Sequence, residues 1–161
     1  MKTLNYKNRT PALAELKVAY RRNPGKSPRP ETRIVPNAEA AIAFFRGVWD
    51  NDTIDLREEF LLLCLTPACE VLGWTRLSTG NREATALDPR TVFGVALATA
   101  SAAIVIAHNH PGGPCRPSEA DLEVTRQLEK GADVLRILFL DHIILTRDEA
   151  FSFGQAGLLG I

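Results

Sequence analysis

Residues 102–113 read AAIVIAHNHPGG, and this stretch decides the fold that the rest of the chain must fit. The uninterrupted apolar run 102–107 predicts a central strand that is buried on both faces of a sheet. His108 and His110 follow directly, and the side-chain alternation of extended backbone places both imidazoles on the same side. The prolines and glycines of 111–114 then predict a sharp change of chain direction.

The segments around this strand alternate between helical and extended patterns. Asn37 and Asp88 are typical helix caps, and the proline after Asp88 favours the first turn of a helix. Strands are predicted where short apolar or alternating runs lie between turn residues. The predicted helices cover 37–49, 88–101 and 118–133, and the predicted strands cover 59–65, 70–78, 102–107 and 137–145. Together they predict an α/β fold, a layered sandwich of helices around a mixed sheet.

The overall composition is that of one folded domain. The chain has 161 residues, of which 45% are hydrophobic and 24% are charged, so it holds enough apolar material for one core. No apolar run approaches the ~20 residues that a membrane span needs. No apolar signal segment follows Met1. We therefore expect a cytoplasmic protein with no membrane partner.

The first part of the chain differs from the rest in charge. Residues 1–33 carry nine Lys or Arg against two acidic residues, whereas the remainder carries ten against seventeen. The proline-rich stretch 21–36 is typical of a linker, and the alternation of Leu16–Tyr20 indicates one short strand. We therefore divide the chain into a basic N-terminal arm with its linker, 1–35, and a folded domain, 36–161. The arm could contact DNA, although a net charge of zero argues against indiscriminate binding.

Three side chains near the Pro/Gly turn have the chemistry and spacing of a metal site. His108 and His110 offer two imidazole nitrogens, and the following helix brings Ser118 and Asp121 to one face, three residues apart. Two nitrogens and one carboxylate oxygen leave an open coordination position, as in catalytic zinc sites, where the metal activates a water molecule. The alternative is structural, because Ser118 and Asp121 also have the spacing of a helix capping box.

Hydrolysis at such a metal also needs a general base and a donor to the developing oxyanion. Glu58 and Glu59 begin an apolar strand, and alternation lets only one of them face the metal. Either could instead be a solvated charge at the strand end. Ser118 is the candidate donor to the oxyanion.

Two more residues near the site have open roles. Cys115 is one of three cysteines, an odd number without a CxxC pair, so we expect free thiols. Because Cys115 lies close in sequence to the candidate ligands, contact with the metal is left open. His142 lies on an apolar strand, where a histidine is usually packed and hydrogen-bonded; the alternative is a role on the substrate side.

At this point the residues resemble a known family. HxHP followed by SxxD, with a glutamate upstream, is similar to the JAMM motif of JAB/MPN metalloproteases. The stretches AHNHPGG, PSEADLEVTRQL and LDHIIL resemble the bacterial RadC-like branch, and the similarity covers about residues 36–159. Gly112 departs from the serine that is usual in this branch. The helix-hairpin-helix segment that precedes the domain in full-length RadC proteins is not recognisable in residues 1–35.

The resemblance implies a fold, a cofactor and a set of site residues. The fold is a three-layer α-β-α sandwich with a mixed sheet, of the cytidine-deaminase-like type. The metal is Zn²⁺ on His108, His110 and Asp121, with Ser118 assisting, Glu58 as the catalytic glutamate and Glu59 as the second choice.

Two functions are consistent with these observations. The first is a zinc-dependent hydrolase, a metallopeptidase or isopeptidase that acts on a peptide or protein substrate. The alternative is a DNA-associated accessory protein of a mobile element or repair pathway, without peptidase activity, as the DNA-repair label of the family and the basic arm suggest. A zinc nucleoside deaminase is disfavoured, because its H-x-E and P-C-x-x-C signature is missing.

Overall fold

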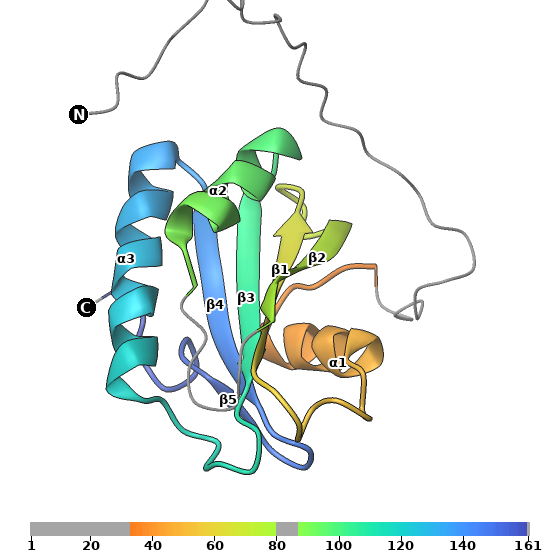
Figure 1. Ribbon diagram of the computed structural model, residues 1–161. Coiled ribbons are helices and arrows are strands. Elements are labelled where there is room, and N and C mark those ends of the chain that lie inside the picture. Colours follow the sequence, from red (N-terminus) through yellow and green to blue (C-terminus); the bar gives the residue numbers. More distant parts are fainter. Residues whose placement is uncertain (1–32, 80–86, 161) are drawn as a thin grey trace, which may run out of the picture.

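Three layers build the part of the chain that the computed structural model describes, residues 33–79 and 87–160. A five-stranded sheet in the order β2-β1-β3-β4-β5 lies between α1 on one face and α2 and α3 on the other (Figure 1). The helices are α1 (Ala38–Val48), α2 (Pro89–Ala98) and α3 (Glu119–Leu135), and the strands are β1 (Glu59–Leu65), β2 (Val71–Thr79), β3 (Ala103–Asn109), β4 (Leu138–Leu145) and β5 (Ala150–Ser152). The predicted α-β-α sandwich is confirmed.

Some predictions concern residues outside these ranges. The strand predicted at Leu16–Tyr20 and nearly all of the basic arm lie outside the described residues. The division of the chain at residue 35 therefore stays a prediction. Among the described residues, no helix is both long and apolar enough to cross a membrane.

The central strand β3 is hydrogen-bonded along both edges, and each of its residues is buried. It pairs antiparallel with β1 and parallel with β4, which makes the sheet mixed, as predicted. This pairing sets Phe60 beside His108 on one edge and Ile144 beside it on the other. A slip of one residue would turn every side chain to the opposite face, so the different packing of the two faces fixes the register.

Side-chain alternation along the central strands divides the core into two halves. The half beneath α1 includes Phe44, Phe45, Leu61, Leu63, Leu65 and Val105, and the half beneath α2 and α3 includes Leu62, Val92, Phe93, Ile104, Ile106 and Leu128. His108 has the parity of Ile104 and Ile106, so it faces the α3 side. Asn109 has the opposite parity and faces the α1 side.

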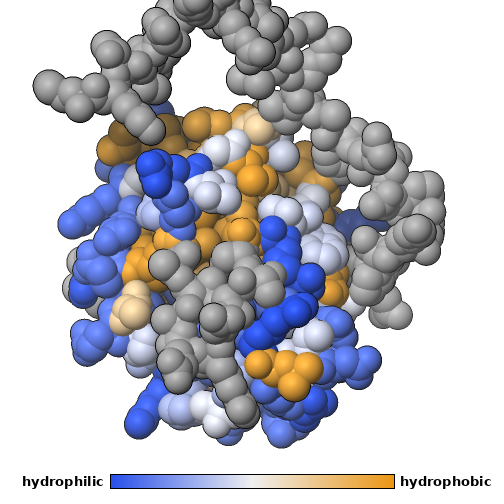
Figure 2. Space-filling model, in the orientation of Figure 1, coloured by the Kyte–Doolittle hydropathy of each residue, from blue (hydrophilic) through white to orange (hydrophobic). Residues whose placement is uncertain are grey.

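Helix α3 turns one stripe toward the sheet and the rest toward solvent. The buried residues of the helix are Asp121, Thr125, Leu128 and Ala132, a spacing that keeps them on one face. Figure 2 shows hydrophilic residues gathered on the side of the molecule that α3 covers. The inward stripe thus contributes apolar residues to the core at its C-terminal end and polar residues to the candidate site at its N-terminal end.

Local sequence signals predicted the helix starts. The side chain of Asn37 accepts a hydrogen bond from the Ala40 N–H at 2.9 Å, and that of Asp88 accepts one from the Arg90 N–H at 2.9 Å. Both residues are therefore N-caps, and Pro89 occupies the first turn, as predicted.

Two differences from the predicted elements have local causes. Helix α2 ends at Ala98 rather than near residue 101, because Ala100 adopts a left-handed conformation with φ of 51° and the chain turns there into β3. Strand β5 was not predicted. It has three residues, too few to show an alternating pattern, and it is held by pairing with the end of β4.

The contact between α2 and α3 predicts opposite effects for two glycine-to-alanine substitutions. A Cβ on Gly131 would lie 2.4 Å from the ring of the buried Phe93, whereas a Cβ on Gly94 would meet nothing within 4 Å. We expect Gly131→Ala to lower the free energy of unfolding by about 1 kcal/mol, because overpacking exceeds the gain in helix propensity. Gly94→Ala should raise it by about 0.5–1 kcal/mol. Urea unfolding of both variants measures this, and stabilisation by Gly131→Ala would contradict the packing.

Candidate metal centre

The end of β3 and the turn after it bring the predicted histidines to the start of α3. His108 is the penultimate residue of β3 and is fully buried, and His110 follows the strand. The turn after Pro111 uses a left-handed glycine, Gly112 with φ of 64°. The chain then enters α3 beside the two imidazoles, so residues of the first helical turn can reach them.

Ser118 and Asp121 form the capping box that was the structural alternative for these residues. The Asp121 Oδ2 atom accepts hydrogen bonds from the Ser118 N–H at 2.7 Å and from its hydroxyl at 2.6 Å, and the Ser118 Oγ atom accepts one from the Asp121 N–H at 3.2 Å. The same carboxylate faces the histidines. The cap therefore orients Asp121 toward them, and the structural and metal-binding interpretations of this pair are compatible.

The ligand atoms of His108, His110 and Asp121 lie together as the spacing predicted. The two Nε2 atoms are 2.9 Å apart, and Asp121 Oδ1 lies 3.0 Å from His108 Nε2, while Oδ2 lies 3.4 Å from His110 Nε2. A tetrahedral zinc ion with bonds of ~2.0–2.1 Å separates its ligands by about 3.3 Å. The three residues thus fit a divalent transition metal with nitrogen and oxygen ligands, although the geometry does not select zinc among such metals.

The proton on His110 supports this fit. Its Nδ1 atom lies 3.0 Å from the carbonyl oxygen of Pro114, and because a carbonyl can only accept, Nδ1 must carry the proton. In the neutral ring, Nε2 then has a free lone pair directed at His108 and Asp121. An imidazole with this proton pattern is a metal ligand whose orientation is fixed by its second nitrogen.

Burial and charge together favour a cation at this point. Burial alone would raise the pKa of the Asp121 carboxyl, but the adjacent imidazoles and the Ser118 hydroxyl hold that pKa well below its usual range, so the group is a carboxylate. Burial lowers the pKa of His108. Asp121 above all, with a smaller effect of the Glu58 charge, raises the pKa of His110. A proton on His110 therefore competes with a metal ion for the same lone pair.

The two candidate glutamates point to opposite faces of the sheet. Glu59 is 1% exposed and pairs with Arg57 at 2.8 Å and with Arg76 at 3.2 Å. Glu58 immediately precedes β1, has the parity of Phe60, whose ring stacks on His108, and acts on the pKa of His110. Of the two, Glu58 lies on the metal side, while its role as general base stays a prediction.

Asn109 is a site residue that was not singled out from the sequence. Its side chain is buried, accepts from the Glu59 N–H at 2.8 Å and donates to the carbonyl oxygens of Ile54 and Arg57. These bonds tie the segment that carries Glu58 to the end of β3. A signal existed, because a polar residue at a position buried on the α1 side must find partners there.

His142 lies behind His108, on the edge of that ring away from Asp121. Its Nε2 atom is 2.8 Å from His108 Nδ1, and the residue is fully buried. The prediction of a packed, hydrogen-bonded histidine is confirmed.

Cys115 lies apart from the three candidate ligands. Its thiol contacts the carbonyl oxygen of Ile144 at 3.5 Å, and burial above all raises the pKa of that thiol. It is absent from the cluster of ligand atoms, so the contact with the metal that was left open is not found.

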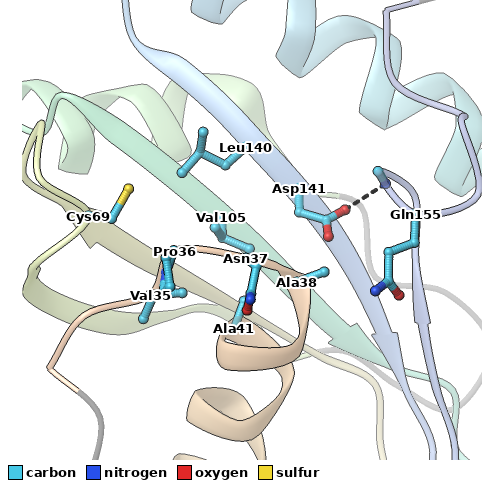
Figure 3. Close-up of a pocket in the computed structure, with 11 residues that line it drawn as sticks. Val35, Pro36, Asn37, Ala38, Ala41, Cys69, Val105, Leu140, Asp141 and Gln155 are labelled. Carbon is cyan, nitrogen blue, oxygen red and sulfur yellow. Dashed lines mark hydrogen bonds between the residues drawn. The ribbon is translucent and has the colours of Figure 1, made fainter.

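A cavity of about 330 Å³ lies on the opposite side of the sheet, between the start of α1 and β4 (Figure 3). The buried polar side chain in its lining is that of Asp141. Its carboxylate accepts hydrogen bonds from the Ser152 hydroxyl and from the N–H groups of His142 and Gly154, the last drawn as a dashed line in Figure 3. Because this carboxylate is already satisfied by the protein, the cavity contributes nothing to the metal centre. Its neighbour His142 points the other way.

The sequence is also similar to known proteins. The family model described as the RadC-like JAB domain matches residues 35–158. A UPF0758 protein of Chlorobium luteolum is 33% identical over 132 residues, which are 82% of this chain and 58% of that protein. UPF0758 proteins of Chlorobaculum parvum and Geobacter sulfurreducens are 35% and 38% identical over 79% and 64% of this chain, and 56% and 45% of their own lengths. The chain thus spans about half the length of these curated relatives.

The three converging side chains predict which substitutions abolish metal binding. After loading with a divalent metal and desalting, we expect His108→Ala and Asp121→Ala to retain little bound metal, because each removes one of three ligands. Cys115→Ser should retain the wild-type amount. Elemental analysis by mass spectrometry measures the stoichiometry, and circular dichroism checks that each variant is folded. Equal metal content in folded His108→Ala and wild type would refute the assignment.

Proposed function

The chain belongs to the RadC-like JAB domain family, and from this membership and the geometry of the centre we propose that it is a zinc-dependent hydrolase of peptide or isopeptide bonds. The observation that carries the proposal is the convergence of His108, His110 and Asp121 at the end of β3, with Glu58 on the same side. JAB domains include metalloproteases and are commonly zinc-dependent. Zinc is therefore the metal that we propose for this set.

The three protein ligands leave a coordination position for water or substrate. Three protein ligands leave at least one position open in a four-coordinate ion, which distinguishes catalytic from closed structural zinc sites. When bound, the ion supplies Lewis acidity, which activates water and polarises a carbonyl oxygen. His110 is the ligand on the solvent side, with 17% of its side chain exposed, whereas His108 is fully buried. A substrate would therefore approach from the side of His110 and Glu58.

Glu58 is the residue that we propose to move the proton. It acts electrostatically on His110, so its carboxylate is close enough to the open side of the centre to influence a group there. A carboxylate in that place can accept a proton from the attacking water and deliver it to the leaving amine. Glu59 cannot do this, because it is buried beneath the opposite face with two arginines.

Ser118 has a positioning role before any role in catalysis. Its hydroxyl donates to Asp121 Oδ2, and its Oγ atom caps the helix. We retain Ser118 as the proposed donor to the oxyanion, which requires its hydroxyl to turn from Asp121 to the substrate oxygen. The N-terminus of α3 beside it also favours negative charge.

The proposal predicts separate effects for the two glutamates. We expect Glu58→Gln to keep the bound zinc but to slow hydrolysis by about 10²–10⁴, the usual effect of losing a general base. Glu59→Gln should keep the activity while lowering the free energy of unfolding by about 1–3 kcal/mol, because it removes the charge with which a buried carboxylate holds two arginines. A quenched-fluorescence peptide library and a panel of isopeptide-linked proteins serve as substrates. Full activity of zinc-loaded Glu58→Gln would remove Glu58 as the base.

A second proposal, binding to DNA, is favoured by the charge of the arm alone. Residues 1–33 carry nine basic residues against two acidic ones. If the arm binds the phosphate backbone, the affinity of the full chain for duplex DNA should fall steeply between 50 and 200 mM salt. Replacing the arginines and lysines of the arm by glutamine should abolish that binding and leave the metal content unchanged. Fluorescence anisotropy with a labelled duplex measures the affinity, and an unchanged affinity would exclude the arm.

A further inference from the structure

A buried chain of hydrogen bonds runs from the ligand His108 back to the ligand Asp121. His108 Nδ1 lies 2.8 Å from His142 Nε2, and His142 Nδ1 lies 2.7 Å from the Thr125 hydroxyl oxygen. That oxygen lies 2.6 Å from the backbone carbonyl oxygen of Asp121. The two histidines are fully buried and Thr125 is 1% exposed, so solvent does not compete for these bonds.

The carbonyl at the end of this chain fixes the direction of every bond. A carbonyl oxygen can only accept, so the single hydroxyl proton of Thr125 must point at Asp121. The hydroxyl oxygen can then only accept from His142, whose proton must be on Nδ1. The two ring nitrogens of His142 contact an imidazole and a hydroxyl, and the ring is fully buried, so a positive charge there would have no carboxylate beside it. The ring is therefore neutral, and its Nε2 is bare. His108 must therefore donate from Nδ1.

This chain of hydrogen bonds leaves the Nε2 atom of His108 with a lone pair that faces the other candidate ligands. A neutral His108 with its proton on Nδ1 has a bare Nε2, and that atom faces His110 Nε2 at 2.9 Å and Asp121 Oδ1 at 3.0 Å. When His110 is also neutral, all three atoms are acceptors with no proton between them. Such a cluster is repulsive by itself and becomes favourable around a cation.

Packing holds the His142 ring in the plane that this pattern needs. The ring stacks on Phe153 with centroids 4.5 Å apart and an interplanar angle of 13°. The backbone N–H of His142 donates to the Asp141 carboxylate at 2.8 Å. His108 is held in the same way by Phe60, at 4.6 Å and 18°. Stacking fixes the plane of each ring, and the hydrogen bonds between His108, His142 and Thr125 decide which edge of the ring carries the nitrogens on each side.

We propose that Thr125 and His142 are positioning residues that fix the proton of His108 on Nδ1, so that its Nε2 is presented to the metal as a ligand. This inference rests on the metal-binding part of the proposed function and not on the bond that is hydrolysed. Thr125 touches no metal-facing atom, so an effect of its hydroxyl on metal affinity must pass through His142 and His108.

The decisive variant is Thr125→Val, which keeps the shape of the side chain and removes the hydroxyl. His142 Nδ1 then has no acceptor, which favours a proton on His142 Nε2. His142 would donate that proton to His108 Nδ1, so the proton of His108 would lie on Nε2, the atom that faces the metal. We expect zinc affinity to fall about 10–100-fold, as for other residues that orient metal ligands. Competition with a chromophoric chelator, using zinc alone, measures the affinity.

Matched variants separate this effect from a general loss of packing. Thr125→Ser keeps the hydroxyl and should bind zinc like the wild type. Thr99→Val removes a hydroxyl that also donates to the carbonyl four residues earlier, in α2, and should leave zinc affinity unchanged. If Thr125→Val failed to fold, a comparison of His142→Gln with His142→Phe provides the same test. Only glutamine keeps an acceptor for His108 Nδ1, so His142→Gln should bind zinc more tightly than His142→Phe.

A spectroscopic readout tests the proton pattern without any variant. Two-bond ¹H–¹⁵N correlation spectra of the metal-free protein with ¹⁵N-labelled histidine should show His108 and His142 both protonated on Nδ1. A proton on His108 Nε2, or wild-type zinc affinity in folded Thr125→Val, would overturn the inference. If the wild type bound no zinc, the proposed function would fail first, and the spectra would still report on the hydrogen-bond chain.

Discussion

Burial of β3 on both faces and along both edges is the constraint on which the rest of the structure depends. A strand that is hydrogen-bonded on each side and covered by helices above and below has one acceptable register. A slip of one residue would exchange the side chains of the two faces, which then fit neither the two halves of the core nor the partners of the polar residues. That register places His108 beside Phe60 of β1 and next to His142 through β4. The polar groups of the site are thus positioned by the same apolar packing that stabilises the sheet.

Helix α3 extends this coupling between core and site. Leu128 and Ala132 pack in the core beneath α2 and α3, and Asp121 and Thr125 continue the same stripe to the end of β3. The capping box adds a second constraint, since the carboxylate that starts the helix is also the one that faces the histidines. Any movement of the helix start would therefore disturb both the cap and the ligand set.

Several polar groups are buried around the centre, and most of their side-chain atoms have partners. Asn109 is satisfied by three backbone groups and Asp141 by the hydroxyl of Ser152 and two N–H groups. Unpaired, each would cost about 1–3 kcal/mol. The Nε2 atoms and carboxylate oxygens of His108, His110 and Asp121 differ from these groups, because there acceptors face acceptors. The membership of the chain in the RadC-like JAB domain family agrees with a metal ion in that place.

The sequence by itself determined the helices with their caps, the buried central strand and the three candidate ligands, because these depend on residues that are close along the chain. The HxH spacing at a strand end and the Ser-x-x-Asp spacing at a helix start are local, and so are the Asn37 and Asp88 caps. Only the tertiary structure decided that Glu58 and not Glu59 lies on the metal side, that Cys115 lies apart from the ligands, and that Thr125 and His142 stand behind His108. These outcomes depend on which face of β1 meets α3 and on the register of β4 against β3, and such pairings between distant segments are set by packing rather than by local pattern.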